Sequence, residues 1–452
     1  MEKQVLSLIE EKKYTRLREC LEELNPADIA LILEEAELRD LPVVFRILPK
    51  ELAAEVFVEM DRDLQQHLIE SFSNTELKDV IDELFMDDMV DIIDEMPASV
   101  AQRILKQTDS KTRNMVNKLL AYPESSAGSV MTTEYLSVKK GMTVDEAFES
   151  IRNNAVDTES IYTCYVTDRS RKLLGVITIR DLLLADKSAV VYDIMDENVI
   201  FANTLTDREE VVSLFDKYDL YVLPVVDNEN RLVGIITVDD VIDVMQEEAT
   251  EDIEMMAAIL PSEKSYLKTG VFATFKARIP WLMFLMISAT FTGAIISSFE
   301  GKLSKWMALI AFIPMLMGTG GNSGSQSSVT VIRCLSTGEI EFKDIWRVIW
   351  KELRVSIVCG VVLGIVNFVK LYLVDYLWLN NFDEGVHLIE MLVVSITVVL
   401  VVIVAKLVGS VLPIVAKKLG ADPAVMASPL VTTILDAFSL LIYFSIATVL
   451  LM

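Results

Sequence analysis

The chain has 452 residues and is 52% hydrophobic, yet it carries 67 acidic side chains against 41 basic ones, a net charge of −26. These properties belong to different halves, because residues 1–265 hold 56 acidic and 27 basic side chains, whereas residues 266–452 hold 11 and 14. The division excludes a single soluble domain, and the acidity of the first half argues against a nucleic-acid-binding protein, whose surface would be basic.

Residues 1–130 are predicted to form an acidic, all-helical N domain. Four segments recur about every 24 residues, each after an apolar-periodic run: Asn25-Pro26, Leu48-Pro49, Ser73-Asn74 and Met96-Pro97. Proline and asparagine are favoured near helix starts, so the spacing predicts short helices stacked on one another. The acid-rich run 85–95 is typical of a solvated helix face.

Residues 131–248 contain an internal repeat. The segment Gly175–Asp181 (GVITIRD) aligns without gaps on Gly234–Asp240 (GIITVDD), and each copy offers a strand, a helix, a β-branched hairpin and a closing helix. The pattern resembles a tandem pair of CBS domains, with copies at 131–186 and 187–248. That resemblance implies sensing of adenosyl ligands or ions and not catalysis. Asp181 or Asp240 could contact a nucleotide ribose, or could simply cap the helix that follows.

A strongly acidic segment joins the repeats to the hydrophobic half. Residues 239–254 hold eight acidic side chains and no basic one. Repulsion between like charges at helical spacing costs roughly 0.2–0.5 kcal/mol per pair. Packed against other acidic surfaces, a connecting helix over 249–275 would need cations, which is a physical basis for a divalent-ion switch.

Residues 276–452 are predicted to form a five-helix transmembrane domain. The hydrophobic spans fall at about 281–299, 306–332, 355–378, 388–416 and 423–452, each long enough to cross roughly 30 Å of hydrocarbon. Basic residues gather at the helix ends on the side of residue 276. The positive-inside rule therefore places the N-terminal half in the cytoplasm and the C-terminus outside.

Two features inside these spans are unusual. The second span holds a run of small and polar residues, Met317–Ser328, in which the amides of Asn322 and Gln326 share one helix face and can bind water or an ion. Tight helix packing by small residues is the alternative. The last span holds Asp436, the one clearly deep acid, which marks a functional site unless it pairs with Lys406 or Lys370. One carboxylate suits a hydrated Mg²⁺ if a second subunit supplies its twin across a symmetry axis.

With these pieces in order, the chain resembles the MgtE family of magnesium channels along nearly its full length. The motifs that carry the resemblance are PMLMGTGGNSGSQSS at 314–328, DPAVMASPLVTTILDAF at 422–438 and EATEDI at 248–253. It implies a multi-pass plasma-membrane homodimer in lipid, with a helical N domain, an α/β CBS pair, an acidic connecting (plug) helix and five transmembrane helices. Its pore would conduct Mg²⁺ passively along the two-fold axis.

The resemblance also implies the site residues. In the pore they are Asp436 and Asn322, with Gln326 beside them. The implied regulatory Mg²⁺ ligands are Glu55, Asp87, Asp207, Glu209, Asp219, Asp240, Asp243, Glu248, Glu251 and Asp252. An ATP contact would fall on Asp181, although Leu220 stands where an aromatic residue that stacks on the base would help. The resulting hypothesis is feedback gating, in which cytosolic Mg²⁺ bridges the N domain, the CBS pair and the connector and closes the pore.

Two rival functions remain. One is a cation-coupled secondary Mg²⁺ transporter or exporter, against which the chain shows one deep acid and no evident inverted repeat. The other is a nucleotide sensor on a membrane anchor, which would not need Asn322, Gln326 and Asp436 at membrane depth. An enzyme is not expected, because no nucleophile–base constellation appears and the glycine-rich run lies inside a span, not after a strand as in a phosphate-binding loop. The four scattered cysteines and two histidines suggest neither a zinc site nor a disulfide framework.

Overall fold

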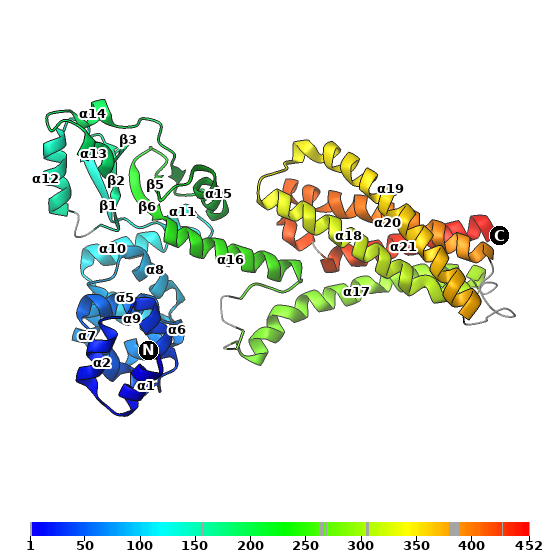
Figure 1. Cartoon of the computed structure of the whole chain (residues 1–452), viewed down its shortest axis with the longest axis horizontal. Helices are drawn as coiled ribbons and strands as arrows, with labels where there is room; N and C mark the ends of the chain where they lie inside the picture. The colour runs from blue at the N-terminus through cyan, green and yellow to red at the C-terminus, as the bar shows by residue number, and fades with distance from the viewer. Residues whose placement is uncertain are drawn as a thin grey trace. The chain divides into compact units, whose positions relative to one another are not determined.

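The computed structural model describes residues 2–154, 158–262, 266–267, 269–303, 307–378, 388–426 and 428–451 (Figure 1). The chain divides into two compact units, Met1–Met245 and Gln246–Met452. Each unit has an apolar core of its own.

The first unit begins with a stack of short helices. Their bounds are α1 Glu2–Glu10, α2 Tyr14–Leu21, α3 Pro26–Glu34, α4 Leu41–Phe45, α5 Lys50–Val58, α6 Arg62–Ser71, α7 Asn74–Ile81, α8 Met86–Glu95, α9 Ala98–Gln107 and α10 Ser110–Leu119. Every second helix starts at the predicted spacing: Pro26 opens α3, while Pro49, Ser73 and Pro97 are the N-caps of α5, α7 and α9. The helical N domain and its 24-residue period are thereby confirmed.

The best-defined of these starts is a capping box at α7. The Ser73 hydroxyl accepts from the Glu76 amide at 3.3 Å, and the Glu76 carboxylate accepts from the Ser73 amide at 2.7 Å. Two backbone donors that the helix leaves free are satisfied in this way. The sequence therefore fixes this helix start through contacts three residues apart.

The rest of the first unit consists of two small α/β copies. The elements are α11 Ala127–Val130, β1 Tyr135–Lys139, α12 Val144–Asn154, β2 Ser160–Thr167, β3 Leu173–Thr178, α13 Ile179–Leu184, α14 Val191–Ile194, β4 Ala202–Asn203, α15 Arg208–Tyr218, β5 Val222–Val226, β6 Leu232–Thr237 and α16 Val238–Met256. Each sheet has three strands in chain order, with the first pair parallel and the second antiparallel. The predicted repeat is confirmed.

The aligned glycines show why the two copies agree. A Cβ on Gly175 would lie 2.6 Å from the Met195 sulfur, and a Cβ on Gly234 would lie 2.7 Å from the Met131 sulfur. At each place an incoming backbone segment crosses the last strand, with Asp196 bridging Val176 in one copy and Thr132 bridging Ile235 in the other. The segment before the first copy is thus bonded to the sheet of the second.

The connector differs from the predicted range 249–275. Helix α16 starts directly after β6, at Val238, and ends at Met256, so the acidic segment continues the last helix of the second copy. Residues 257–262 that follow are not helical.

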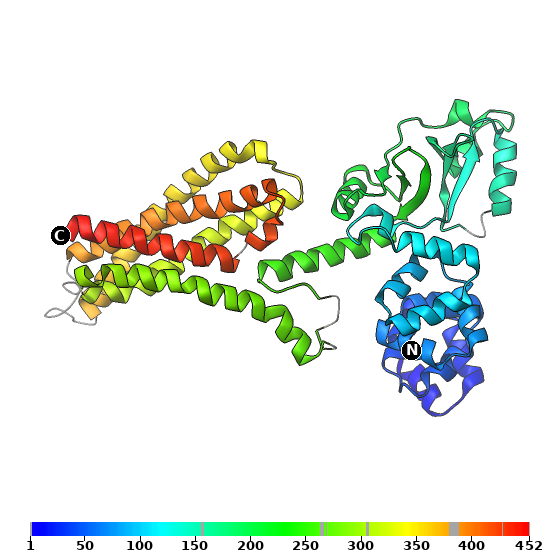
Figure 2. The same ribbon diagram turned by 180° about the vertical axis from the view of Figure 1, so that it is seen from behind.

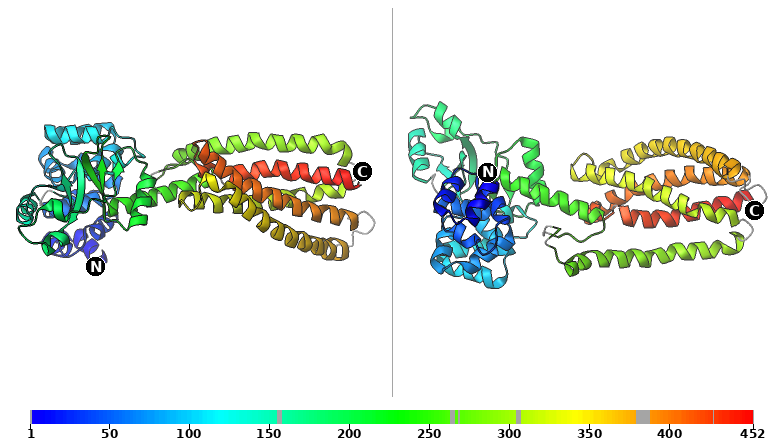
Figure 3. Two further views of the ribbon diagram at one scale, coloured as in Figure 1. Left: turned by 90° about the horizontal axis from the view of Figure 1, so that it is seen from above. Right: turned by 60° about the horizontal axis from the view of Figure 1, so that its bottom comes forward.

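The second unit is a bundle of long helices. The bounds are α17 Val271–Leu303, η2 Met307–Phe312, α18 Ile313–Ser336, η3 Phe342–Asp344, α19 Ile345–Lys370, η4 Leu371–Trp378, α20 Leu388–Lys418, η5 Pro423–Met426 and α21 Ser428–Leu451. The long helices run side by side both in the view from behind and in the view from above (Figures 2 and 3). Among the described residues four are apolar and long enough to cross a membrane, within Val271–Phe299, Phe342–Val374, Leu388–Lys418 and Pro423–Leu451. The second predicted span, 306–332, overlaps α18, which is helical but rich in small and polar residues.

Glycines bring α18 against its neighbours. A Cβ on Gly409 of α20 would collide with the carbonyl oxygen of Gly324, and a Cβ on Gly321 would lie 2.8 Å from the Thr432 methyl group of α21. Some of the small residues in the run Met317–Ser328 therefore serve close helix packing, which was the alternative interpretation of this run. Where this core continues, the buried Tyr443 hydroxyl donates to the Leu309 carbonyl at 2.8 Å.

Candidate functional site

The first unit brings together an acidic cluster, defined here as Asp87, Asp88, Glu134, Glu159, Asp239 and Asp240. Local folding explains how three of these carboxylates reach the cluster. Thr132 pairs with β6, and two residues later Glu134 accepts from the Met86 amide at the start of α8, at 3.0 Å. The Glu159 amide donates to the Glu134 carbonyl at 3.0 Å, just before β2. Asp240 lies in the first turn of α16, which follows β6.

The electrostatics of the cluster are those of crowded carboxylates. Asp87 is buried, and burial, together with the charges of Asp240 and Asp88, raises its pKa well above the ordinary value. Burial and the neighbouring Asp240 likewise raise the pKa of Asp88 to about 7. The same two causes raise the pKa of Glu159 to about 7.

Asp240 lies at the centre of this arrangement. Burial raises its pKa to about 6, with Asp239 and Asp243 adding to the rise, although hydrogen bonds from Thr237 oppose it. Its carboxylate caps α16, accepting from the Thr237 hydroxyl at 2.5 Å. The capping alternative for this residue is therefore correct, and the same carboxylate also faces the acidic cluster.

The donor set fits a hard divalent cation. Carboxylate oxygens are the ligands that Mg²⁺ and Ca²⁺ prefer, and one Glu159 carboxylate oxygen, Oε2, is buried without a hydrogen-bond partner. Within the described residues, no three His, Cys, Asp or Glu side chains already converge as a metal cage. The carboxylates of the cluster are thus close enough to raise one another's pKa values, but they do not form a preformed cage for a bare ion. This arrangement suits an ion that keeps part of its water.

The structure unites some of the sequence-predicted residues and adds others. It brings Asp87 and Asp240 together, as predicted, whereas Glu55 is exposed on α5 and Glu59, one turn later, is the acid that influences Asp88. Sequence reasoning missed Asp88, Glu134 and Glu159. Only the acidic run 85–95 had signalled the first of them, and the other two lie in unremarkable positions beside strands.

Three predicted ligands, Asp207, Glu209 and Asp219, lie at the ends of α15. The Asp207 carboxylate accepts from the Glu209 amide at 2.9 Å and so caps the helix start. Asp219 terminates the helix in a left-handed conformation, with φ of 50°. All three are exposed, and their role as metal ligands remains a prediction.

A second group of acids lies in the second unit. Burial, followed by the charge of Asp422, raises the pKa of Asp252 to about 6, and Glu248 and Glu251 add to it. Asp422 precedes η5, where its carboxylate accepts from the Ala424 amide at 2.7 Å. The structure therefore adds Asp422, in the segment between α20 and α21, to the acids of the connector.

The polar residues of the long helices form a third candidate site. Asn322 and Gln326 are exposed one turn apart on α18, whereas Ser323, Gly324 and Ser327 between and beside them are buried. Asp436 is half-buried on α21, the helix against which Gly321 packs. The described residues contain no ion pair between Asp436 and either Lys406 or Lys370; instead the Lys406 ammonium lies 3.4 Å from the Gln326 amide oxygen.

Asp436 is not the only acid enclosed by these helices. Glu390 in the first turn of α20 is buried, and Glu352 of α19 accepts from the Ser327 hydroxyl at 2.7 Å. The sequence did not indicate these two acids, because the helix ends and the helix rotations that enclose Glu390 and Glu352 depend on tertiary packing.

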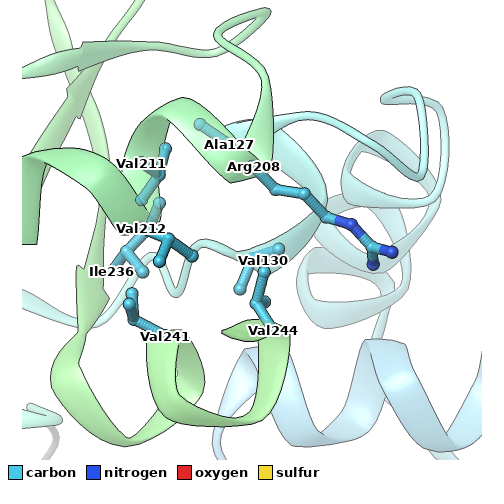
Figure 4. Close-up of a pocket in the computed structure, with 8 residues that line it drawn as sticks. All are labelled: Ala127, Val130, Arg208, Val211, Val212, Ile236, Val241 and Val244. Carbon is cyan, nitrogen blue, oxygen red and sulfur yellow. The ribbon is translucent and has the colours of Figure 1, made fainter. Parts of the chain in front are cut away.

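The nucleotide candidate, Asp181, occupies a helix cap. Its carboxylate accepts from the Thr178 hydroxyl at 2.5 Å, repeating the Thr237–Asp240 arrangement of the other copy. A separate small pocket lies among α11, α15, β6 and α16 (Figure 4). Its lining is aliphatic except for Arg208, whose guanidinium points away from the aliphatic side chains, so the pocket offers no anchor for an ion.

Comparison with known proteins covers nearly the whole chain. Residues 313–446 match the family model of the MgtE divalent cation transporters, residues 24–125 match the MgtE intracellular N domain, and residues 127–188 and 191–247 match CBS domains. The magnesium transporter MgtE of Thermus thermophilus is 40% identical over 439 residues, covering 96% of this chain and 95% of the relative. The magnesium transporter MgtE of Bacillus subtilis is 34% identical over 444 residues, covering 98% and 96%. Among solved structures, the cytosolic domain of the Mg²⁺ channel MgtE in complex with ATP superimposes with a TM-score of 0.52 at 40% identity, covering 54% of this chain and 100% of that one.

Proposed function

The chain belongs to the MgtE family of magnesium transporters, and from this premise we propose that it is a Mg²⁺-selective channel that takes up magnesium and is closed by cytosolic Mg²⁺. The family is one of transporters and not of enzymes, and the chain is a membrane protein with a cytosolic N-terminal part.

The observation that carries the conduction proposal is the polar face of α18. Amides and hydroxyls on a membrane helix are costly against lipid and are retained where they border water or protein. Asn322 and Gln326 are exposed on α18, and Asp436 lies on the helix packed beside it. Two copies of the chain would enclose these groups on a common axis, with α18 as the fifth spanning helix, and the paired carboxylates would hold a hydrated Mg²⁺.

The gating proposal follows from the raised pKa values of the cytosolic acids. Carboxylates that repel one another in a partly buried cluster favour separation, and a bound divalent ion reverses that preference. Changing a two-state equilibrium from mostly open to mostly closed requires about 5.5 kcal/mol of differential binding in total. That amount can be divided among ions at the acidic cluster, at Asp252 with Asp422, and at the remaining predicted ligands.

The proposal also includes a membrane orientation and a nucleotide. We propose that the chain lies in the plasma membrane with its C-terminus outside, and the basic residues near the predicted cytosolic helix ends favour this orientation. ATP is the nucleotide for the CBS pair, since a relative's cytosolic domain has been solved with it. For Asp181 to contact a ribose, its carboxylate would have to accept from the ribose in addition to the Thr178 hydroxyl, or break its hydrogen bond with that hydroxyl.

Mg²⁺ flux into proteoliposomes tests the proposal. Asp436→Ala should abolish uptake, whereas Asp87→Ala combined with Asp252→Ala should leave uptake running when Mg²⁺ is high on the cytosolic side. Asp436→Asn, which keeps the shape and removes the charge, is the matched control for folding. An unchanged Mg²⁺ flux in the Asp436→Ala variant would refute the assignment of Asp436 to the pore.

The second candidate is a cation-coupled Mg²⁺ transporter. The buried Glu390 and the hydrogen-bonded Glu352 favour it, because carboxylates within membrane helices can serve a coupled ion. Mg²⁺ current in the absence of any Na⁺ or pH gradient supports the channel, and strict dependence on such a gradient supports the coupled transporter.

A further inference from the structure

Lys406 is a buried cation that the conduction proposal does not use. It lies in the middle of α20 and is only 6% exposed. Its ammonium lies 3.4 Å from the Gln326 amide oxygen and 3.5 Å from the Ser327 hydroxyl oxygen, both on α18. A lysine in this position requires polar partners, and α18 supplies them at the turn that carries the exposed amides.

The hydrogen-bonding capacities of these groups are consistent with one arrangement. Serine has one donor, and the Ser327 hydroxyl gives it to the Glu352 carboxylate at 2.7 Å. Its oxygen lone pairs therefore remain for the ammonium. Lysine only donates, so the atom that Gln326 turns toward it is the amide oxygen. Helices α18, α19 and α20 are thus joined through a lysine, a serine and a glutamate, and the charges of Lys406 and Glu352 are bridged by Ser327.

This arrangement has a consequence for any cation near Gln326. An ammonium competes with that cation for the amide oxygen, which is the only atom of the side chain that can accept from coordinated water or bind a metal ion. Its fixed positive charge also repels the cation, and repulsion is stronger in a poorly solvated bundle than in water. Rapid passage requires a site that binds an ion but releases it again.

We propose that Lys406 is a positioning residue that holds the amide oxygen of Gln326 and, by competing with Mg²⁺ there, keeps ion binding weak enough for passage. The inference rests on the proposed function, since it takes Gln326 to face the ion path. It assigns a role to a residue whose sequence-based alternative was pairing with Asp436.

Mg²⁺ uptake into proteoliposomes that contain a chelator tests the proposal, with half-saturating Mg²⁺ and maximal flux measured separately. Lys406→Met should lower half-saturating Mg²⁺ about tenfold, equivalent to about 1.4 kcal/mol, and should lower maximal flux because release slows. Lys406→Arg, which keeps a charged donor, should remain within about twofold of the wild type on the same scale. Lys370→Met, a change at an exposed lysine of α19, is the matched control and should alter neither quantity.

A double-mutant cycle separates positioning from a purely structural tie. In a Gln326→Ala background, Lys406→Met should no longer lower half-saturating Mg²⁺. An equal fall in that background, or a half-saturation unchanged or raised by Lys406→Met in the wild-type background, would overturn the proposal. If Lys406→Met does not fold, Lys406→Gln undergoes the same cycle with the same criteria. Failure of the wild-type protein to carry Mg²⁺ would instead refute the proposed function, so the two failures are distinguishable.

Discussion

Replacing Asp88 by asparagine should stabilise the first unit when no divalent ion is present. Asp88 lies on α8 beside Asp87, close to Asp240, Glu134 and Asp239, and burial together with these charges raises its pKa from 3.8 to about 7. A carboxyl whose pKa rises on folding binds its proton more tightly in the folded state. The folded state is therefore penalised as pH rises from about 4 to about 7, and the penalty is constant above that range.

The size of the effect follows from the shift. About three pKa units correspond to on the order of 4 kcal/mol in the isolated folded unit. Movement of α8 away from α16 relieves part of that repulsion, so we expect Asp88→Asn to add about 2 kcal/mol at pH 8. For a unit of this size the melting temperature should rise by roughly 4–8 °C.

Thermal unfolding of the purified fragment 1–256 checks this prediction, since a relative's cytosolic domain has been solved by itself. In EDTA the substitution should stabilise at pH 8 and have little effect at pH 4, where Asp88 is protonated. Mg²⁺ at pH 8 should stabilise the wild type more than the variant. Glu149→Gln, at an exposed position of α12, is the matched control. A destabilised Asp88→Asn protein at pH 8, or an equal gain at both pH values, would refute the reasoning.

Three further predictions concern other parts of the chain. Gly409→Ala should destabilise the second unit by about 1–3 kcal/mol, because the added methyl group collides with a backbone carbonyl of α18; thermal denaturation in detergent measures this, and Gly318→Ala, which meets no atom within 4 Å, should be tolerated. Ser73→Ala should cost about 1 kcal/mol in the urea unfolding of the cytosolic fragment, through loss of the α7 capping box. Asp422→Asn should lower the pKa of Asp252 toward its ordinary value, and closure of the channel by cytosolic Mg²⁺ should then need several-fold more Mg²⁺, at least about threefold; an unchanged inhibition curve in the flux assay would contradict it.

The elements that could be predicted from the sequence are those fixed by contacts between near neighbours. Pro26, Pro49, Ser73 and Pro97 act on their own helix starts, so the 24-residue period was sufficient to place α3, α5, α7 and α9. The agreement between the copies around Gly175 and Gly234 could be predicted for a related reason. Each glycine leaves room for a backbone segment that crosses the last strand of its sheet, and this crossing occurs in both copies. The extent of the connector was missed because the helix that contains it begins at Val238, before the acidic run.

The acidic cluster could be predicted only in part, for the opposite reason. Asp87 and Asp240 are 153 positions apart in the chain, and what brings them together is the pairing of Thr132 with β6 and the capping of α8 by Glu134. Neither contact leaves a pattern in the local sequence. The role of Glu134 is especially hard to anticipate, because it satisfies a backbone donor of a helix that ended 39 residues earlier, at Glu95.

Helix periodicity likewise placed Asn322 and Gln326 on one face but could not say which lysine approaches it. That depends on the rotation of α20 relative to α18, which the close contact at Gly324 and Gly409 fixes. With the helices held there, the side chain of Lys406, three residues before Gly409, meets Gln326 and Ser327 and leaves Asp436 without that partner. The two alternatives weighed for the polar features, tight packing and ion binding, are therefore linked: the small residues set the helix rotation that decides which charge faces the amides and which remains for Mg²⁺.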